Sequence, residues 1–318
     1  MTPKERFIAA LERKPLTGLV PHFELVFFLT MEAFGKLHTS QRVYDQWDQM
    51  SKTERKLHTR EIAKLQTDVC ERFGHSAIMF IPPRGWNDDD IRRCLDLIVE
   101  TSGGKYAIAM HGDCTFSIPN GDNMMEFSLR MAEDPEGLKK QAAANCDYNA
   151  RYSEKLRSWG NIDFLCLCSD YCFNANPYFS PAQFDDFITP YLAKTIKLQR
   201  DLGFHVVKHT DGNIMPILPN LVECNPHALH SIDPQGHVDI AEVKRIAGGK
   251  VALIGNVSCG ALTTGTDADV EQSVRYALDN GMPGYGYIFS TSNCVHTGMP
   301  LERYELMLEL WRKYGVYK

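Results

Sequence analysis

The stretch that decides the fold is HVVKHTDG, residues 205–212. Two adjacent β-branched valines, Val206 and Val207, lie in its first half, as is typical of a buried parallel strand. Its second half ends in ionisable residues and a glycine. Because the loops that follow the strands of a parallel barrel build its active site, we predict that this strand carries functional side chains at its carboxyl end.

The same pattern recurs along the chain. Seven further runs read as short buried strands: Val20–Leu25, Ser76–Pro82, Tyr106–Gly112, Ile162–Tyr171, Ala228–Asp233, Lys250–Ser258 and Gly286–Ser292. Helical patterns lie between them: Asp88–Thr101, Pro135–Trp159, Pro181–Leu202, Val238–Ala247, Asp267–Asn280 and Pro300–Tyr314. Strands that alternate with helices in this way predict an α/β protein with a single (β/α)8 TIM barrel over residues 1–318.

Two consequences of the barrel can be checked. The runs at 20–25 and 286–292 should be neighbours in one closed sheet. The segment 29–73 is too long for a usual connection, so we expect an N-terminal helical lid that orders on ligand binding. An open doubly wound sheet is the alternative, but no Gly-x-Gly-x-x-Gly motif follows the first strand.

Composition excludes several classes of function. The formal net charge is −6 and no block of Lys and Arg occurs, which argues against nucleic-acid binding. No apolar run approaches the roughly 18 residues of a membrane helix. The N-terminus is not a secretory signal, and the 10 cysteines are scattered, so we expect a reduced, cytoplasmic protein. Assembly into a homo-oligomer is left open.

Polar residues gather where the predicted strands end. His209 and Asp211 are two residues apart on one strand, so both side chains point to the same face and could share a metal ion. Asp170 ends the fourth strand, and Glu24 lies on the first. We interpret His209, Asp211, Asp170 and Glu24 as the catalytic residues, because so many ionisable groups at one end of a barrel are costly to bury without a task.

Several motifs in the last third of the chain resemble the uroporphyrinogen decarboxylase superfamily. They are KHTDGN at 208–213, SIDP at 231–234, LIGNV at 253–257 and GYIFSTS at 286–292. The resemblance runs from about Gly203 to the C-terminus and implies a TIM barrel. The superfamily contains the decarboxylase of haem synthesis and corrinoid-dependent methyltransferases.

The decarboxylase reading fits the first strand poorly. That strand offers no arginine for an acidic tetrapyrrole, and Glu24 would repel substrate carboxylates. A lyase that uses His209 and Asp211 as acid–base groups is therefore kept as an alternative, and a non-catalytic binding barrel is the third interpretation.

The methyltransferase branch implies a zinc site of the form His-x-Cys after strand five with a further cysteine after strand eight. Here Asp211 stands in the place of the first cysteine, and Cys294 lies near the place of the second. The predicted metal ligands are His209, Asp211 and Cys294. Replacing a thiolate with a carboxylate favours oxygen donors. The resemblance therefore implies an O-demethylation, in which a small O-methyl compound, preferably a methoxyaromatic ether, gives its methyl group to cobalamin on a partner corrinoid protein.

The remaining predictions concern the walls of the site. Three residues are expected to contact the cofactor: Asn256, Ser290 and Ser292. Five are expected to contact the substrate: His22, Phe28, Trp86, Phe179 and His296. We expect Asp170 or Asn256 to fix the tautomer of the His209 ring. The other histidines, His230 among them, are interpreted as structural.

Overall fold

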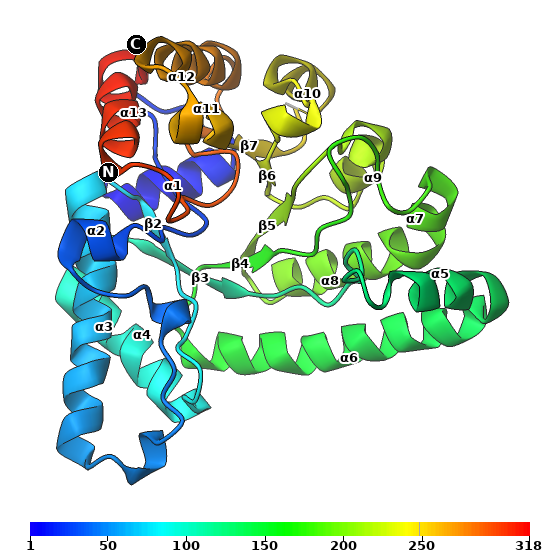
Figure 1. Cartoon of the computed structure of the whole chain (residues 1–318), viewed down its shortest axis with the longest axis horizontal. Helices are drawn as coiled ribbons and strands as arrows, with labels where there is room; N and C mark the ends of the chain where they lie inside the picture. Colours follow the sequence, from blue (N-terminus) through cyan, green and yellow to red (C-terminus); the bar gives the residue numbers. More distant parts are fainter. Residues whose placement is uncertain (248) are drawn as a thin grey trace.

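The computed structural model describes residues 1–247 and 249–318. Its centre is a parallel sheet in which the strand order follows the chain order, β2 to β8 (Figure 1). The strands are β2 (Ala77–Met79), β3 (Ala107–His111), β4 (Phe164–Leu167), β5 (His205–Thr210), β6 (Ala228–Ser231), β7 (Ala252–Ile254) and β8 (Tyr287–Ile288). Each lies within a predicted run, and the predicted TIM-type α/β fold is confirmed.

The segment around His22 joins the two edges of this sheet. His22 forms parallel bridges with His75, just before β2, and with Phe289, just after β8. The Phe23 amide donates to the Phe289 carbonyl at 3.0 Å, and the Ser76 amide donates to the His22 carbonyl at 2.7 Å. The predicted neighbours at 20–25 and 286–292 are therefore adjacent. The regular strand just before them, β1 (Gly18–Leu19), instead pairs antiparallel with β9 (Val316–Tyr317).

Helices surround the sheet (Figure 1). They are α1 (Pro3–Leu11), α2 (Thr30–Phe34), α3 (Lys52–Phe73), α4 (Asp88–Ser102), α5 (Met124–Glu133), α6 (Pro135–Trp159), α7 (Pro181–Phe187), α8 (Thr189–Asp201), α9 (Leu218–Glu223), α10 (Ile240–Ala247), α11 (Cys259–Thr264), α12 (Asp267–Gly281) and α13 (Leu301–Tyr314). Short 3₁₀ turns are η1 (Thr39–Gln41), η2 (Trp47–Gln49), η3 (Met215–Ile217) and η4 (Pro234–Gly236).

Two helical predictions need comment. The single helix predicted over 181–202 is two helices, α7 and α8, because Pro190 has no amide hydrogen and its ring disfavours helical geometry before it. The segment 29–73 holds α2, η1, η2 and α3, and α3 packs against α4 in the outer layer of the barrel. That the segment acts as a lid stays a prediction.

The interior of the barrel is apolar toward the strand starts and polar toward the strand ends. Small side chains that point into the barrel fill its interior near the strand starts: Ala77, Ala107, Ala109, Ala228 and Ala252. The α1 helix packs on this cluster, with the Phe7 ring 5.5 Å from that of Phe23 and 5.0 Å from that of Phe164. Since side chains alternate between faces, the next inward positions lie one layer higher. These positions carry His111, Cys168, His209, His230 and Ser290.

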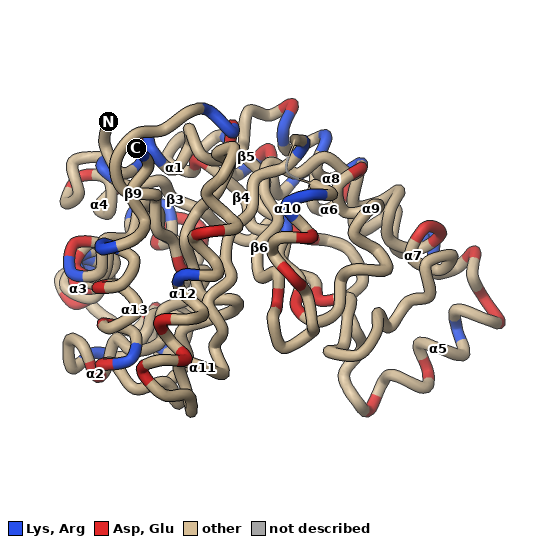
Figure 2. Tube along the Cα trace, turned by 90° about the horizontal axis from the view of Figure 1, so that it is seen from above, with Lys and Arg blue, Asp and Glu red and all other residues tan. Residues whose placement is uncertain are grey.

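Charge is mixed over the surface. Figure 2 shows acidic and basic positions along the same helices, for example on α3. Within residues 1–247 and 249–318, no helix has both the length and the apolar character needed to cross a bilayer.

Candidate metal centre

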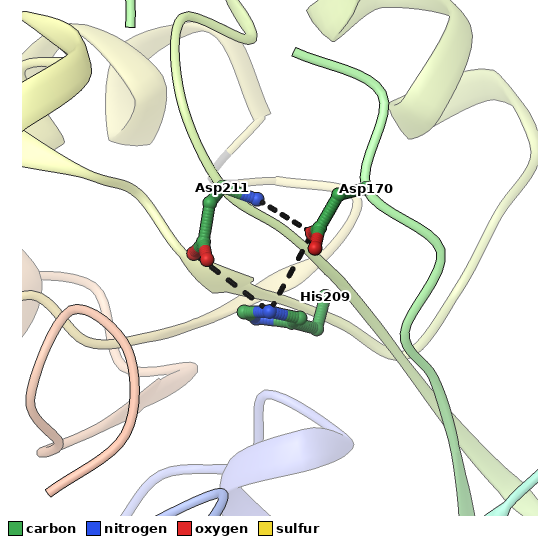
Figure 3. A group of neighbouring side chains, drawn as sticks. All are labelled: Asp170, His209 and Asp211. Carbon is green, nitrogen blue, oxygen red and sulfur yellow. Dashed lines mark hydrogen bonds and ion pairs between the residues drawn. The ribbon is translucent and has the colours of Figure 1, made fainter. Parts of the chain in front are cut away.

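Three side chains converge at the carboxyl ends of β4 and β5 (Figure 3). Asp170 lies just beyond β4, His209 lies in β5, and Asp211 follows β5 directly. Their ligand atoms all lie within 4.8 Å of one another. The His209 Nε2 atom is 3.7 Å from Asp170 Oδ1 and 3.7 Å from Asp211 Oδ1. These separations are too long for hydrogen bonds, and one nitrogen with two carboxylates is a donor set that Zn²⁺ accepts.

The glycine of HTDG is required by the packing of this corner. Gly212 has φ +76°, and a Cβ atom there would lie 2.6 Å from the backbone oxygens of Cys172 and Phe173. The loop after β4 therefore passes directly over the end of β5. This contact brings Asp170 to Asp211, whose amide donates to Asp170 Oδ1 at 3.2 Å.

Neighbouring strands orient the carboxylate of Asp211. The Ser231 hydroxyl, at the end of β6, lies 2.7 Å from Asp211 Oδ1 and 2.6 Å from the Ser292 carbonyl oxygen. The Asn293 amide, in the loop after β8, donates to Asp211 Oδ2. The loop after β8 thus reaches across the barrel mouth to β5.

Electrostatics in this corner favour a cation. Burial, and after it the nearby carboxylates of Asp170 and Asp233, raise the pKa of Asp211 to about 7. Burial also raises the pKa of Asp170. A bound divalent cation would offset both costs, since an opposite charge stabilises the ionised carboxylate.

His209 is held as a neutral ring. It is 5% exposed, and burial followed by the neighbouring His230 lowers its pKa well below the usual range. Neutral imidazole is the form that binds metals. Its Nδ1 atom lies 2.8 Å from His230 Nδ1, so Nε2 faces the two carboxylates.

The contact that fixes the ring differs from the sequence prediction. Asp170 lies on the Nε2 side of His209, and the Asn256 amide donates to the Ile232 carbonyl at 2.9 Å. The partner of the His209 ring is instead His230, which we predicted to be structural. The signal available in the sequence was its place two residues after Ala228, on the strand next to His209.

Glu24 lies between the segment around His22 and the end of β8. It is 3% exposed and lies 3.0 Å from His22 Nε2 through Oε1. Burial raises its pKa to about 7, against the lowering effect of hydrogen bonds from Thr291 and Ser290. Its role as a catalytic residue stays a prediction.

A second charged pair was missed by the sequence analysis. The Lys208 ammonium, on the outer face of β5, lies 2.9 Å from Asp113 Oδ2 and 2.9 Å from the Ser169 carbonyl oxygen. Burial alone would raise the pKa of Asp113, but Lys208 and the Thr115 hydrogen bonds bring it down to about 2. The signal was a lysine inside an apolar strand, which requires a carboxylate partner. The pair ties the ends of β3, β4 and β5 together.

The other predicted site residues occupy varied places. Cys294 is half-buried in the loop after β8, outside the group of Asp170, His209 and Asp211, and its role as a ligand stays a prediction. Burial, and after it Asp211, raise the pKa of its thiol to about 12. The predicted cofactor contacts are all buried: Asn256, Ser290 and Ser292.

The predicted substrate contacts differ in their burial and in their neighbours. His22 and Phe179 are fully buried. Trp86 packs on Trp47, with ring centroids 5.1 Å apart. Phe28 and His296 are half-buried, and His296 Nε2 lies 3.2 Å from the Thr263 hydroxyl. Contact of any of these side chains with substrate stays a prediction.

Comparison with known proteins supports the architecture. The model of the uroporphyrinogen decarboxylase (URO-D) family matches residues 119–314. No curated protein matches the chain in sequence. A methyltransferase from Methanosarcina mazei has a similar structure, with a TM-score of 0.76 over 99% of each chain at 17% identity. GH5_18 from Streptomyces cattleya in complex with GlcNAc has a TM-score of 0.51 over 94% of this chain and 81% of its own, at 10% identity. At such identities the structural likeness establishes the fold alone.

Proposed function

The chain belongs to the uroporphyrinogen decarboxylase family, and from the geometry of its site we propose that it is a zinc-assisted methyltransferase. The proposed methyl donor is a small O-methyl compound, with methoxyaromatic ethers favoured. The proposed acceptor is the cobalt of cobalamin carried by a partner corrinoid protein. Methyl transfer is also the activity named for the Methanosarcina mazei protein of similar fold.

One observation carries this proposal, the convergence of Asp170, His209 and Asp211 at the barrel mouth. Three of the side chains of Asp170, His209, Asp211 and Cys294 would hold the zinc ion and leave one position open for the ether oxygen of the substrate. When bound, zinc would supply a Lewis acid that draws electron density from the ether oxygen and so improves the leaving group. Oxygen-rich donor sets favour harder metals and harder substrates, which is why an ether is preferred over a thioether.

The charge of the mouth argues against an acidic tetrapyrrole as substrate. The carboxylates of Asp170 and Asp233 lie close enough to Asp211 to raise its pKa, so three acidic groups lie near one another there. The nearby Lys208 ammonium is already paired with Asp113. A substrate with several carboxylates would meet net repulsion, whereas a neutral ether would not.

The protein residues have separable tasks in this proposal. His209 offers a neutral ring nitrogen, and Asp170 and Asp211 offer negative charge on the same side. Ser231 and Asn293 hold the Asp211 carboxylate in place. The low exposure of His209 keeps bulk water from its ring.

The test uses free cob(I)alamin as acceptor and 2-methoxyphenol or methanol as donor. Zinc-loaded protein should form methylcobalamin, followed by its absorbance, and His209→Ala should reduce the rate by at least about 100-fold, in line with loss of a metal ligand. His111→Ala is the matched control for metal retention, because His111 lies near the mouth but outside the three-residue group. Transfer that is independent of zinc and of His209 would refute the proposal.

A further inference from the structure

A chain of buried polar groups runs from the metal centre down into the barrel. His209 Nδ1 lies 2.8 Å from His230 Nδ1. His230 Nε2 lies 3.5 Å from the Ser290 hydroxyl, which in turn lies 3.2 Å from Glu24 Oε2. The four residues come from β5, β6, the end of β8 and the first barrel segment, and all are buried.

The hydrogen bonds that join these four residues can run in only two directions. Two imidazole nitrogens at hydrogen-bond distance must share one proton, because one donates and the other accepts. The Ser290 hydroxyl likewise has a single proton to give. Either every donor points toward Glu24, or every donor points toward His209.

Glu24 decides between these directions. Its Oε2 atom also lies 2.6 Å from the Thr291 hydroxyl and 3.2 Å from the Thr291 amide, so it is an acceptor. Its Oε1 atom lies 3.0 Å from His22 Nε2, and His22 Nδ1 lies 3.3 Å from the Phe73 carbonyl oxygen. A carbonyl only accepts, so a neutral His22 ring that donates to Phe73 carries its proton on Nδ1 and leaves Nε2 as an acceptor for a protonated Glu24.

This arrangement holds whichever charge Glu24 carries. When Glu24 is neutral, its proton lies on Oε1 toward His22, and Oε2 remains an acceptor. When Glu24 is ionised, both oxygens accept, and the His22 proton then lies on Nε2 and is donated to Oε1. In both cases Ser290 donates to Glu24, His230 donates to Ser290 through Nε2, and His209 donates to His230 through Nδ1.

We propose that Glu24, acting through Ser290 and His230, fixes His209 in the tautomer that presents a lone pair on Nε2 to Asp170 and Asp211. Glu24, Ser290 and His230 are then positioning residues for a cation at this site, an inference that rests on the proposed function. The opposite tautomer would place an N–H between the two carboxylates and occupy the place of the cation.

The test is ¹⁵N NMR of the full-length, metal-free protein labelled at histidine, with the His209 signals assigned by their loss in His209→Gln. The wild-type ring should carry its proton on Nδ1. In Ser290→Ala the signal of the Nε2-protonated tautomer should appear, and the affinity for Zn²⁺ should fall roughly 10-fold or more, the usual effect of losing an outer-shell partner. Ser290→Thr, which keeps a hydroxyl, should restore both properties.

Thr291→Val is the matched control. It also removes one hydroxyl that contacts Glu24, but this hydroxyl does not contact His230. The tautomer of His209 should therefore be unchanged in this variant. A wild-type ring protonated on Nε2, or equal effects of Ser290→Ala and Thr291→Val, would overturn the inference, and the wild-type spectrum decides even if Ser290→Ala fails to fold. If the Nδ1 proton is found but the protein binds no zinc, the proposed function fails and the hydrogen-bond assignment stands.

Discussion

Replacing Glu24 with glutamine should change how the stability of the protein depends on pH. Glu24 is buried, and its ionisable neighbours include His22, His75 and Tyr304, which are buried as well. Glu24→Gln keeps an acceptor toward Ser290 and a donor toward His22, while it removes the carboxyl group that titrates. The variant therefore isolates the free energy of ionising this one group.

The size of the effect follows from the pKa. Burial raises the pKa of Glu24 from 4.5 to about 7. Between these values the folded protein keeps a proton that the unfolded chain has lost, so unfolding releases a proton and the free energy of unfolding falls as pH rises. At about 1.4 kcal/mol for each pKa unit, the loss amounts to about 3 kcal/mol, complete above about pH 7.

The assay is thermal unfolding of metal-free wild type and Glu24→Gln at pH 4.5, 6 and 8. For a chain of 318 residues, 3 kcal/mol corresponds to a change in Tm of about 4–5 °C. Relative to the variant, the wild type should lose this much between the lowest and the highest pH, because all other titrating groups are shared. Parallel Tm curves would show that Glu24 is not a neutral buried carboxyl group.

Three further perturbations test the rest of the framework. Lys208→Met should lower the free energy of unfolding by about 3–5 kcal/mol, because it leaves the Asp113 carboxylate buried without its partner. In urea unfolding, the double variant Lys208→Met with Asp113→Asn should lose less of this free energy than Lys208→Met alone. Hydrogen peroxide should oxidise Cys114 and Cys146 to a disulfide, because their Sγ atoms lie 3.6 Å apart. The number of free thiols should then fall by two, and Cys146→Ser should prevent this loss. An unchanged number of free thiols in the wild type would contradict the prediction. Phe7→Ala should lower the free energy of unfolding by about 3–5 kcal/mol, because it leaves a cavity where α1 packs on the apolar end of the barrel. A loss below about 1 kcal/mol in the same assay would contradict this contribution of Phe7.

The architecture could be predicted because it depends on patterns local to the sequence. Helix α6 was predicted at Pro135–Trp159 and has these bounds, since Asp134 caps its start, Pro135 suits its first turn and Gly160 ends it. The strands were found as short apolar runs. The first run was harder to place, because it joins both sheet edges through single bridges at His22 rather than through a regular ladder.

The site was predicted in part, and the limits have a physical cause. The pairing of His209 with Asp211 follows from the two-residue period of a strand. The contact of His209 with His230 depends on the register between β5 and β6, in which these residues stand opposite each other. That register, and the reach of Asn293 to Asp211 across the mouth, belong to tertiary structure and leave little trace in a single sequence.

Diffraction at the zinc absorption edge, from crystals grown with zinc, would locate the proposed metal ion. We expect one strong anomalous peak among Asp170, His209 and Asp211, at about 2.0–2.1 Å from His209 Nε2, and no such peak in crystals of His209→Ala. A wild-type protein without a peak at this position, or a variant that retains it at full strength, would show that these residues do not form a zinc site.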